Sequence, residues 1–229
     1  MGAVDAWHEV LHKIEDLKSE ERSFCGGVAD IAKFFDQIRR DLVYQLAEAA
    51  GMPKPIVRAY KTYLENLQVY NCLAGGIGTP YQRKCGIPQG CPYSMAMVAL
   101  IMRPWIIMMR SYGSIQCYIL ADDVLIMATG KQMIGSFAKA LNETHKYLHT
   151  MGSKVAPTKS YNFASRQKTS QWLKDTVWEH IQANIETVAG FRYLGAHLTT
   201  KSAVNSGTLD KRWGKRASSS GGLGIAQPM

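Results

Sequence analysis

The sequence lacks paired cysteines, a secretory leader and any apolar run long enough to cross a bilayer. Its five cysteines are odd in number and scattered, and no two form a Cys-x-x-Cys pair. This pattern indicates reduced intracellular thiols and excludes a disulfide framework or a cysteine zinc site. The longest apolar run, 95–102, ends at Arg103 and falls far short of the roughly 20 residues that a membrane-spanning helix needs. We therefore expect a protein of the nucleus or cytoplasm, neither secreted nor membrane-bound.

Acidic residues are few relative to basic ones. The 229 residues include 27 Lys and Arg against 18 Asp and Glu, which gives a formal net charge of +9. This balance favours a polyanionic partner, most simply nucleic acid, although charge alone fits an ordinary basic protein equally well. Hydrophobic residues make up 46% of the chain, which is enough for a sizeable core and excludes a disordered chain.

Hydrophobic periodicity predicts helices mixed with short strands, and the sequence contains no internal repeat. Apolar residues at helical spacing predict helices over 6–18, 39–50, 53–67, 94–109 and 132–151. Short apolar runs predict strands near 28–31 and 160–164, and hairpins within 69–85 and 111–127. A last hairpin is predicted to pair 185–188 with 191–195, and the Ser/Gly-rich end from 218 onward is predicted to be disordered.

Two adjacent carboxylates, Asp122 and Asp123, lie between two apolar, strand-like runs. Within a strand they would point to opposite faces, whereas at the tip of a hairpin both can reach one cleft. Burying two unpaired negative charges costs on the order of several kcal/mol. A bound cation would offset this cost, and exposure of the turn to solvent would avoid it. The pair therefore predicts either a cation site or a plain polar turn.

A His-Glu-x-x-His pattern at 8–12 matches the zinc-protease motif. A zinc site needs a third protein ligand. The extended motif would place a glycine and a histidine where this chain has Glu15 and Lys18. We therefore interpret His8 and His12 as part of a polar helix face.

Five motifs in chain order resemble those of a reverse transcriptase palm, most like the palms of non-LTR retroelements and group II introns. They lie at 30–36 (Asp-Ile-Ala-Lys-Phe-Phe-Asp), 86–94 (Gly-Ile-Pro-Gln-Gly-Cys-Pro-Tyr-Ser), 120–123 (Leu-Ala-Asp-Asp), 159–160 (Lys-Ser) and 191–195 (Phe-Arg-Tyr-Leu-Gly). The resemblance implies an α+β polymerase palm, an antiparallel sheet backed by helices with a ferredoxin-like core and partial fingers. It divides the chain into an amino-terminal helix and fingers remnant (1–23), the reverse transcriptase palm domain (24–200), and a truncated thumb start with a disordered tail (201–229).

The resemblance also implies two-metal nucleotidyl transfer from a dNTP to a primer 3′ hydroxyl. In such chemistry two divalent ions, roughly 3.5–4 Å apart, stabilise the attacking and leaving oxygens. Asp30 and Asp122 would hold both ions, the Ile31 carbonyl would add a ligand, and Asp123 would support them. Oxygen ligands of this kind suit Mg²⁺, with Mn²⁺ as the alternative. Lys159 would approach the pyrophosphate as a cation and proton donor.

Further site residues follow from the same resemblance. Phe35 would exclude the ribose 2′ hydroxyl and so favour deoxynucleotides, while Gln89 and Gly90 would border the nucleotide and template. Arg83 would touch phosphates. The primer grip would comprise Phe191, Tyr193, Leu194 and Gly195. The implied partners are an RNA template, a DNA primer and dNTPs, with flanking domains of a longer polyprotein as a further expectation.

The chain departs from the family pattern in three ways. Leu120 stands where an aromatic residue is expected, only 29 residues precede Asp30, and the thumb segment after the last motif is short. We therefore expect the RNA-directed DNA polymerase of a retroelement, weakly active or inactive as this chain stands. The alternatives are a non-catalytic, maturase-like RNA-binding palm and, against the implication of Phe35, an RNA-dependent RNA polymerase.

Overall fold

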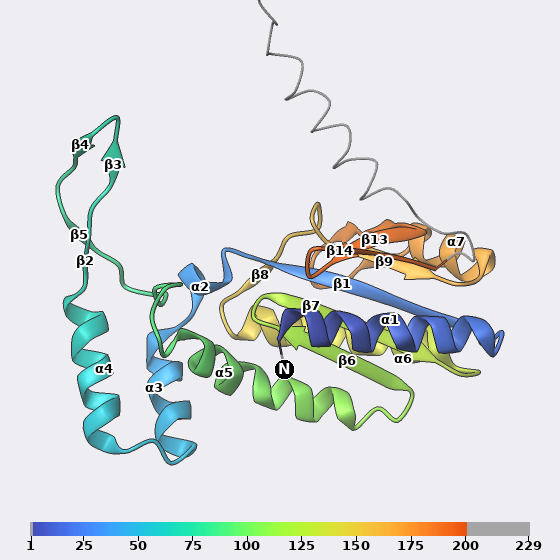
Figure 1. Cartoon of the computed structure of the whole chain (residues 1–229), viewed down its shortest axis with the longest axis horizontal. Helices are drawn as coiled ribbons and strands as arrows, with labels where there is room; N and C mark the ends of the chain where they lie inside the picture. Colours follow the sequence, from blue (N-terminus) through green and yellow to red (C-terminus); the bar gives the residue numbers. More distant parts are fainter. Residues whose placement is uncertain (1, 201–229) are drawn as a thin grey trace, which may run out of the picture.

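The computed structural model describes residues 2–200, and its centre is a sheet of six strands, four of which form an antiparallel core (Figure 1). The strands β1 (Phe24–Ala32), β6 (Ile115–Leu120), β7 (Asp123–Thr129) and β9 (Tyr161–Ala164) lie in the order β9-β1-β7-β6. Every neighbouring pair among these four is antiparallel. Helices connect β1 to β6 and β7 to β9, which gives the strand order and connectivity of a ferredoxin-like core. The predicted α+β fold class is therefore confirmed.

One face of the sheet is covered by helices α5 (Ser94–Arg110) and α6 (Met133–Thr150). Their apolar stripes pack on the odd-numbered residues of β1 and the even-numbered residues of β7, so alternation along the strands selects this face. Trp105 of α5 donates a hydrogen bond to Thr144 Oγ1 of α6 at 2.9 Å, which satisfies two buried polar groups at the helix contact.

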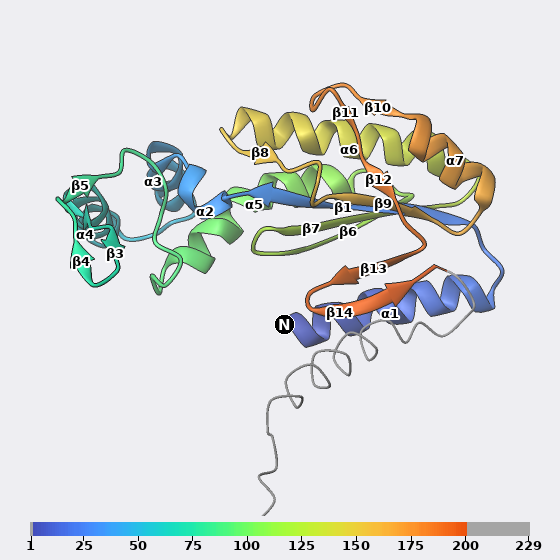
Figure 2. The same ribbon diagram turned by 90° about the horizontal axis from the view of Figure 1, so that it is seen from above.

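The opposite face is covered by helix α1 (Ala3–Ser19) and the hairpin of β13 (Gly190–Tyr193) and β14 (Ala196–Thr199), as Figure 2 shows. A second core joins them to the sheet; its members include Val10, Ile14, Phe163 and Phe191. The rings of Phe163 and Phe191 stack with centroids 4.4 Å apart. Helix α1 thus shares a core with the sheet.

Gly26 in β1 makes this close packing feasible. A Cβ built on Gly26 would lie 2.5 Å from the Phe163 ring and from the Ile126 carbonyl oxygen. Only a residue without a side chain lets the ring cross the strand at that point.

A lobe of helices extends from the end of β1, away from the sheet (Figure 1). It contains α2 (Phe34–Gln37), α3 (Arg40–Ala49) and α4 (Lys54–Asn66). From α4 a long hairpin projects, in which β2 (Gln68–Val69) pairs with β5 (Tyr81–Gln82), and β3 (Cys72–Leu73) pairs with β4 (Gly76–Ile77). The helices and glycine-rich hairpin predicted here are all present.

The last predicted hairpin is wrong in its pairing. Strand β12 (Glu186–Thr187) instead runs parallel to β9, and β13 pairs with β14. The turn between β13 and β14 is Leu194-Gly195, with φ of 47° and 88°, and a two-residue turn with two positive φ values suits the twist of a hairpin. Strand-like runs precede and follow β13 in the sequence, and the Leu194-Gly195 turn makes β13 pair with the run that follows it.

Smaller elements complete the description. They are β8 (Lys154–Val155), which pairs with the end of β1, α7 (Gln167–Asp175), β10 (Val177–Trp178) and β11 (Ala183–Asn184). Within residues 2–200, no helix is long and apolar enough to span a membrane. The predicted thumb start and tail, 201–229, lie outside the described residues.

Candidate active site

Two aspartates face each other across the central strands. Asp30, near the end of β1, pairs in register with Asp123, the first residue of β7. The preceding pair on this side is Val28 with Leu125, and both belong to the core under α1 and the β13–β14 hairpin. Because side chains alternate, Asp30 and Asp123 point to that same face. Directly opposed residues in an antiparallel pair have Cβ atoms about 4.5–5.5 Å apart.

Asp122 lies in the turn that joins β6 to β7. Leu120 pairs with Asp123, so Ala121 and Asp122 form a two-residue hairpin turn. Ala121 has a φ of 55°, in the left-handed region, which costs a residue with a Cβ roughly 1–2 kcal/mol. A strained residue beside paired carboxylates is typical of functional sites. Asp122 therefore lies at the hairpin tip, and Asp123 begins the strand beside it.

The three carboxylates are half-buried and lack compensating partners. Burial, followed by the negative charges of Asp122 and Asp30, raises the pKa of Asp123 above its ordinary value. No described side chain donates a hydrogen bond to Asp30, Asp122 or Asp123, and no described cation pairs with them. Like charges held together in this way are destabilising, and a divalent cation would relieve the repulsion.

The donor set fits a hard divalent cation. Carboxylate oxygens of the three aspartates and the Ile31 carbonyl are ligands that Mg²⁺ accepts, and polymerase sites complete its octahedron with water and substrate phosphates. Across residues 2–200, no group of three His, Cys, Asp or Glu side chains has an arrangement that could hold a metal ion, so the chemistry of the donors, and not their present geometry, supports a cation here. His8 and His12 are exposed on α1, with ring centroids 6.1 Å apart.

A short loop holds the backbone of Asp30 from both sides. The Asp30 amide donates to Ser160 Oγ at 3.1 Å, and the Asp30 carbonyl accepts from the Ala156 amide at 2.9 Å. Ser160 Oγ in turn donates to the Ala156 carbonyl at 2.8 Å. Ser160 is 3% exposed, whereas its neighbour Lys159 is exposed. The Lys-Ser motif at 159–160 includes Ser160, but the sequence gave a role only to Lys159, because the partner of the Ser160 hydroxyl is 130 residues away along the chain.

The segment after Gly86 is attached to the start of the lobe. The Gly86 amide donates to the Ile38 carbonyl at 2.7 Å, and the Ile87 amide donates to the Phe35 carbonyl at 2.8 Å. Gly86 has a φ of 83°, and a Cβ there would lie 2.8 Å from the Asp36 carbonyl oxygen. Phe35 is 7% exposed and packs in the core, with its ring centroid 6.0 Å from that of Phe34.

Two arginines fasten the same segment. Arg40 is 4% exposed; its Nε donates to the Gly86 carbonyl and its Nη1 to the Leu64 carbonyl, both at 2.8 Å. Arg83, which is exposed, forms an ion pair with Asp36. Gln89 and Gly90, which follow, are exposed to solvent. Arg40 was not selected from the sequence, because a single arginine in a helical segment gives no sign that it is buried.

The predicted primer grip lies beside the carboxylates. Phe191 and Tyr193 are buried on β13, while Leu194 and Gly195 form the hairpin turn. Burial, followed by the charge of Asp123, raises the pKa of Tyr193. Its hydroxyl makes no hydrogen bond within the described part of the chain. The structure therefore gathers Asp30, Asp122, Asp123 and the β13–β14 hairpin at one end of the sheet, and places Phe35, Arg83, Gln89 and Gly90 at the lobe.

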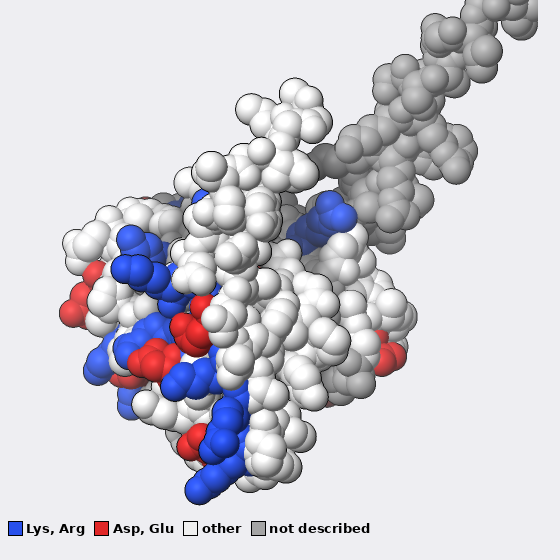
Figure 3. Space-filling model, turned by 90° about the vertical axis from the view of Figure 1, so that its left-hand side faces the viewer, with Lys and Arg blue, Asp and Glu red and all other residues white. Residues whose placement is uncertain are grey.

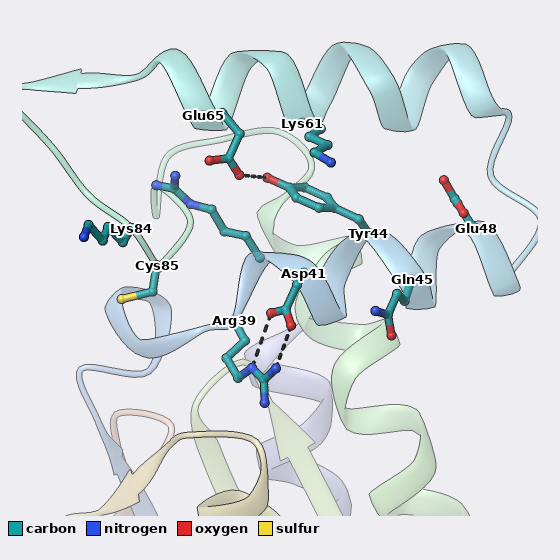
Figure 4. A pocket seen from close by; sticks show the side chains of 10 residues that line it. Arg39, Asp41, Tyr44, Gln45, Glu48, Lys61, Glu65, Lys84 and Cys85 are labelled. Atoms are coloured by element: carbon teal, nitrogen blue, oxygen red, sulfur yellow. Dashed lines mark hydrogen bonds and ion pairs between the residues drawn. The ribbon is translucent and has the colours of Figure 1, made fainter.

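A polar pocket of about 650 Å³ lies between α3 and α4 (Figure 4). Among its seven charged side chains, all within the described residues, Arg39 and Asp41 form the one ion pair. Arg39 binds Asp41 with an Nη2–Oδ2 distance of 2.6 Å, and the Tyr44 hydroxyl donates to Glu65 at 3.0 Å. The sequence did not predict this pocket, which forms only when two helices of the lobe pack side by side.

The fold and the facing carboxylates define a polymerase-type α+β domain. The family described as reverse transcriptase (RNA-dependent DNA polymerase) matches residues 4–198, and the chain belongs to this family. Family members are nucleotidyltransferases that generally use divalent metal ions.

Solved structures of telomerase share the fold. The chain resembles apo telomerase from Candida tropicalis truncated from its C-terminal domain, with a TM-score of 0.56 and 13% identity over 84% of this chain and 38% of that one. It also resembles telomerase from Candida tropicalis in complex with a TWJ fragment of telomeric RNA, with a TM-score of 0.54 and 13% identity over 70% and 30%. The chain thus spans about a third of the length of these telomerase chains. No curated protein sequence matches the chain.

Proposed function

We propose that the chain carries the palm of a retroelement RNA-directed DNA polymerase, which extends a DNA primer on an RNA template. The observation that carries the proposal is the Asp30–Asp123 pair, opposed in register on one face, with Asp122 in the adjoining turn. In the proposed organisation, the palm occupies 24–200, 1–23 is an amino-terminal helix and fingers remnant that packs on the palm sheet, and 201–229 includes the start of the thumb. Intracellular residence, in nucleus or cytoplasm, and flanking domains of a longer polyprotein belong to the same proposal.

Each residue has a role in this proposal. Asp30, Asp122 and the Ile31 carbonyl are the ligands for two Mg²⁺ ions, with Mn²⁺ as a substitute, and Asp123 supports them. When bound, the ions stabilise the attacking 3′ oxygen and the leaving pyrophosphate oxygen. The β8–β9 loop keeps Asp30 in position through Ser160, and Lys159 on that loop offers a cation and a proton to the pyrophosphate.

The remaining residues orient the substrates. Gln89 and Gly90 are exposed in the turn that precedes α5. In this proposal they border the nucleotide and template. Phe35 limits space at the ribose, and Arg83 contacts phosphates after exchanging its ion pair with Asp36. The β13–β14 hairpin, with Phe191, Tyr193, Leu194 and Gly195, supports the primer end beside the carboxylates.

Primer extension tests the proposal. The purified chain is given an RNA template, a DNA primer, dNTPs and Mg²⁺, and is compared with Asp30→Asn, Asp122→Asn and Asp123→Asn. Each substitution should lower the extension rate by at least about 10²–10³-fold, because fixed charge in the site is lost. Asp175→Asn is the matched control, since this carboxylate is exposed on α7 and binds only Gln171 among the described residues.

Stability provides a second readout that does not depend on turnover. Because the pKa of Asp123 is raised, its ionised form destabilises the fold, so Asp123→Asn should raise the melting temperature in the absence of metal. Mg²⁺ should stabilise the wild type more than this variant. RNA binding that survives Asp30→Asn, together with no extension by any form, would favour the maturase-like reading instead. Incorporation of NTPs in preference to dNTPs would favour an RNA polymerase.

A further inference from the structure

The β13–β14 hairpin is joined to the central sheet by few directional contacts. It forms a two-stranded sheet of its own, so no strand of the central sheet pairs with it. The stacking of Phe191 on Phe163 is an apolar contact, which attracts without fixing a direction. The hydroxyl of Tyr161, on β9, donates a hydrogen bond to the Arg192 carbonyl, and within residues 2–200 no other hydrogen bond joins β13 to the central sheet. Because hydrogen bonds are directional, this bond fixes where β13 lies.

Tyr161 lies close to the carboxylates. It pairs in register with Val28 of β1, and Asp30 is the next residue of β1 on the same face. Its ring tilts against that of Phe191, with centroids 5.5 Å apart, in the core under α1 and the hairpin. Burial, followed by the charges of Asp123 and Asp30, raises the pKa of Tyr161. The hydroxyl therefore keeps its proton at neutral pH and remains a donor.

The residue before Tyr161 holds the strand that carries the first carboxylate. Ser160 Oγ accepts the hydrogen bond of the Asp30 amide at 3.1 Å. Two consecutive residues thus hold two separate parts of the site, β1 through Ser160 and β13 through Tyr161. Because the two residues are covalently joined, the hairpin and Asp30 share one frame.

The hairpin offers a primer little charge. Figure 3 shows Lys and Arg side chains gathered on the face of the lobe. Within 190–199, by contrast, Arg192 is the only Lys, Arg, Asp or Glu. The hairpin can therefore act on a primer mainly through where its backbone and apolar side chains lie.

We propose that Tyr161 is a positioning residue, which fixes the β13–β14 hairpin relative to Asp30 and so sets where the primer 3′ end lies beside the metal ligands. This inference rests on the proposed function, and it names the residue that joins the support of the primer to the carboxylates.

Hydrogen exchange of the free protein tests the link without catalysis. Tyr161→Phe keeps the ring and removes only the donor, so the amides of 190–199 should exchange faster, while those of 115–129 should be unchanged. Tyr118→Phe is the matched control, because Tyr118 faces the same core from β6 and its hydroxyl makes no hydrogen bond within the described residues. It should leave both segments as in the wild type.

Single-nucleotide extension tests the consequence for the primer. At saturating primer–template, Tyr161→Phe should lower kcat at least about tenfold, since a reacting group displaced by about 1 Å can cost about 10²-fold. Its KM for the dNTP and its affinity for primer–template should change less than about threefold. Tyr118→Phe should extend like the wild type.

Melting temperatures separate positioning from a general loss of structure. Tyr161→Phe should melt less than about 4 °C below the wild type, since one hydrogen bond is lost. Mg²⁺ should stabilise it as much as the wild type, because the carboxylates are unchanged, whereas Asp30→Asn should lose this stabilisation.

The outcomes distinguish the link from the polymerase. Unchanged exchange of 190–199 in Tyr161→Phe would overturn the link. Faster exchange together with the kcat of the wild type would overturn the positioning role. Faster exchange in the variant, with no extension even by the wild type, would reject the polymerase and keep Tyr161 as the residue that holds the hairpin.

Discussion

The two halves of the candidate site, the carboxylates at the end of the sheet and the segment after Gly86 in the lobe, lie in parts of the molecule that differ greatly in burial. In β7 every residue from Val124 to Ala128 is at most 1% exposed, with a core on either face. In the lobe, the hairpin from Tyr70 to Cys85 is exposed throughout, and its tip residue Leu73 is 85% exposed. The carboxylates thus lie at the ends of buried strands, whereas the segment that begins at Gly86 follows a hairpin that is exposed to solvent.

The contrast shows where the molecule depends on single contacts. The position of Asp30 and Asp123 follows from seven residue pairs between β1 and β7, so no one contact decides it. The segment beginning at Gly86 depends on three hydrogen bonds, those to Ile38, Phe35 and Arg40, and on one glycine conformation. In the lobe, a substitution that removes one of these contacts should therefore lower the free energy of unfolding strongly. In the sheet, substitutions should lower it through lost packing or through a buried charge.

The largest expected effect comes from Gly86→Ala. The alanine would need a φ of 83° and would place a Cβ within 2.9 Å of Asp36 and Phe35 backbone atoms, so it should destabilise the fold by about 3 kcal/mol or more. Urea unfolding measures this loss. Gly90→Ala is the matched control, since its Cβ would meet no described atom within 4 Å, and it should stay within about 0.5 kcal/mol. Equal effects of the two changes would contradict the described geometry.

Acid should weaken the sheet side through His145. Burial, aided by the charge of His180, lowers the pKa of His145 to about 4. The unfolded chain takes up this proton near the usual value of about 6.5, so stability falls as pH decreases from about 6.5 to about 4, by on the order of 3 kcal/mol. Stability above pH 7 should not depend on this proton.

The pH dependence of unfolding for wild type and His145→Leu isolates this contribution. Neither ring nitrogen of His145 has a hydrogen-bond partner among the described residues, so leucine should be accommodated and should flatten the curve. His149→Gln, at an exposed position one turn further along α6, should leave the curve unchanged. An identical acid loss in His145→Leu would assign it to other groups.

A smaller loss is expected from Arg40→Met. The change removes hydrogen bonds to the Gly86 and Leu64 carbonyls and leaves both without this donor, at a cost of about 2 kcal/mol. Arg39→Gln removes only an exposed pair with Asp41 and should cost less than about 0.5 kcal/mol. Thermal unfolding of the two neighbouring variants measures the difference, and a larger effect at Arg39 would reverse the roles assigned to them.

The smallest effect is expected at the tip of the hairpin. Leu73→Ser and Ile77→Ser change side chains that are 85% and 72% exposed, so each should alter the free energy of unfolding by less than about 0.5 kcal/mol. Urea titration of both variants provides the measurement. A loss above about 1 kcal/mol would show that the tip packs against the rest of the molecule, and would remove the contrast between lobe and sheet.

The sequence located the long helices and the main hairpins, and its five motifs gave the α+β palm fold and the reverse transcriptase family by resemblance. Helical periodicity located five helices to within a few residues: α1, α3, α4, α5 and α6. This was possible because the apolar stripe of a helix depends only on residues that are close together in the sequence. The Asp122-Asp123 turn could be predicted for the same reason, since strand-like runs flank it. The roles of the site residues remain proposals, and the pairing of the last hairpin was predicted wrongly because two neighbouring runs were equally strand-like.

Only the tertiary structure decided which distant residues meet. The register that opposes Asp30 to Asp123, the Ser160 hydroxyl under Asp30, and Arg40 on the Gly86 carbonyl join positions 93, 130 and 46 residues apart. Such contacts depend on loop closure and on the packing of whole faces, which no local pattern of side chains encodes.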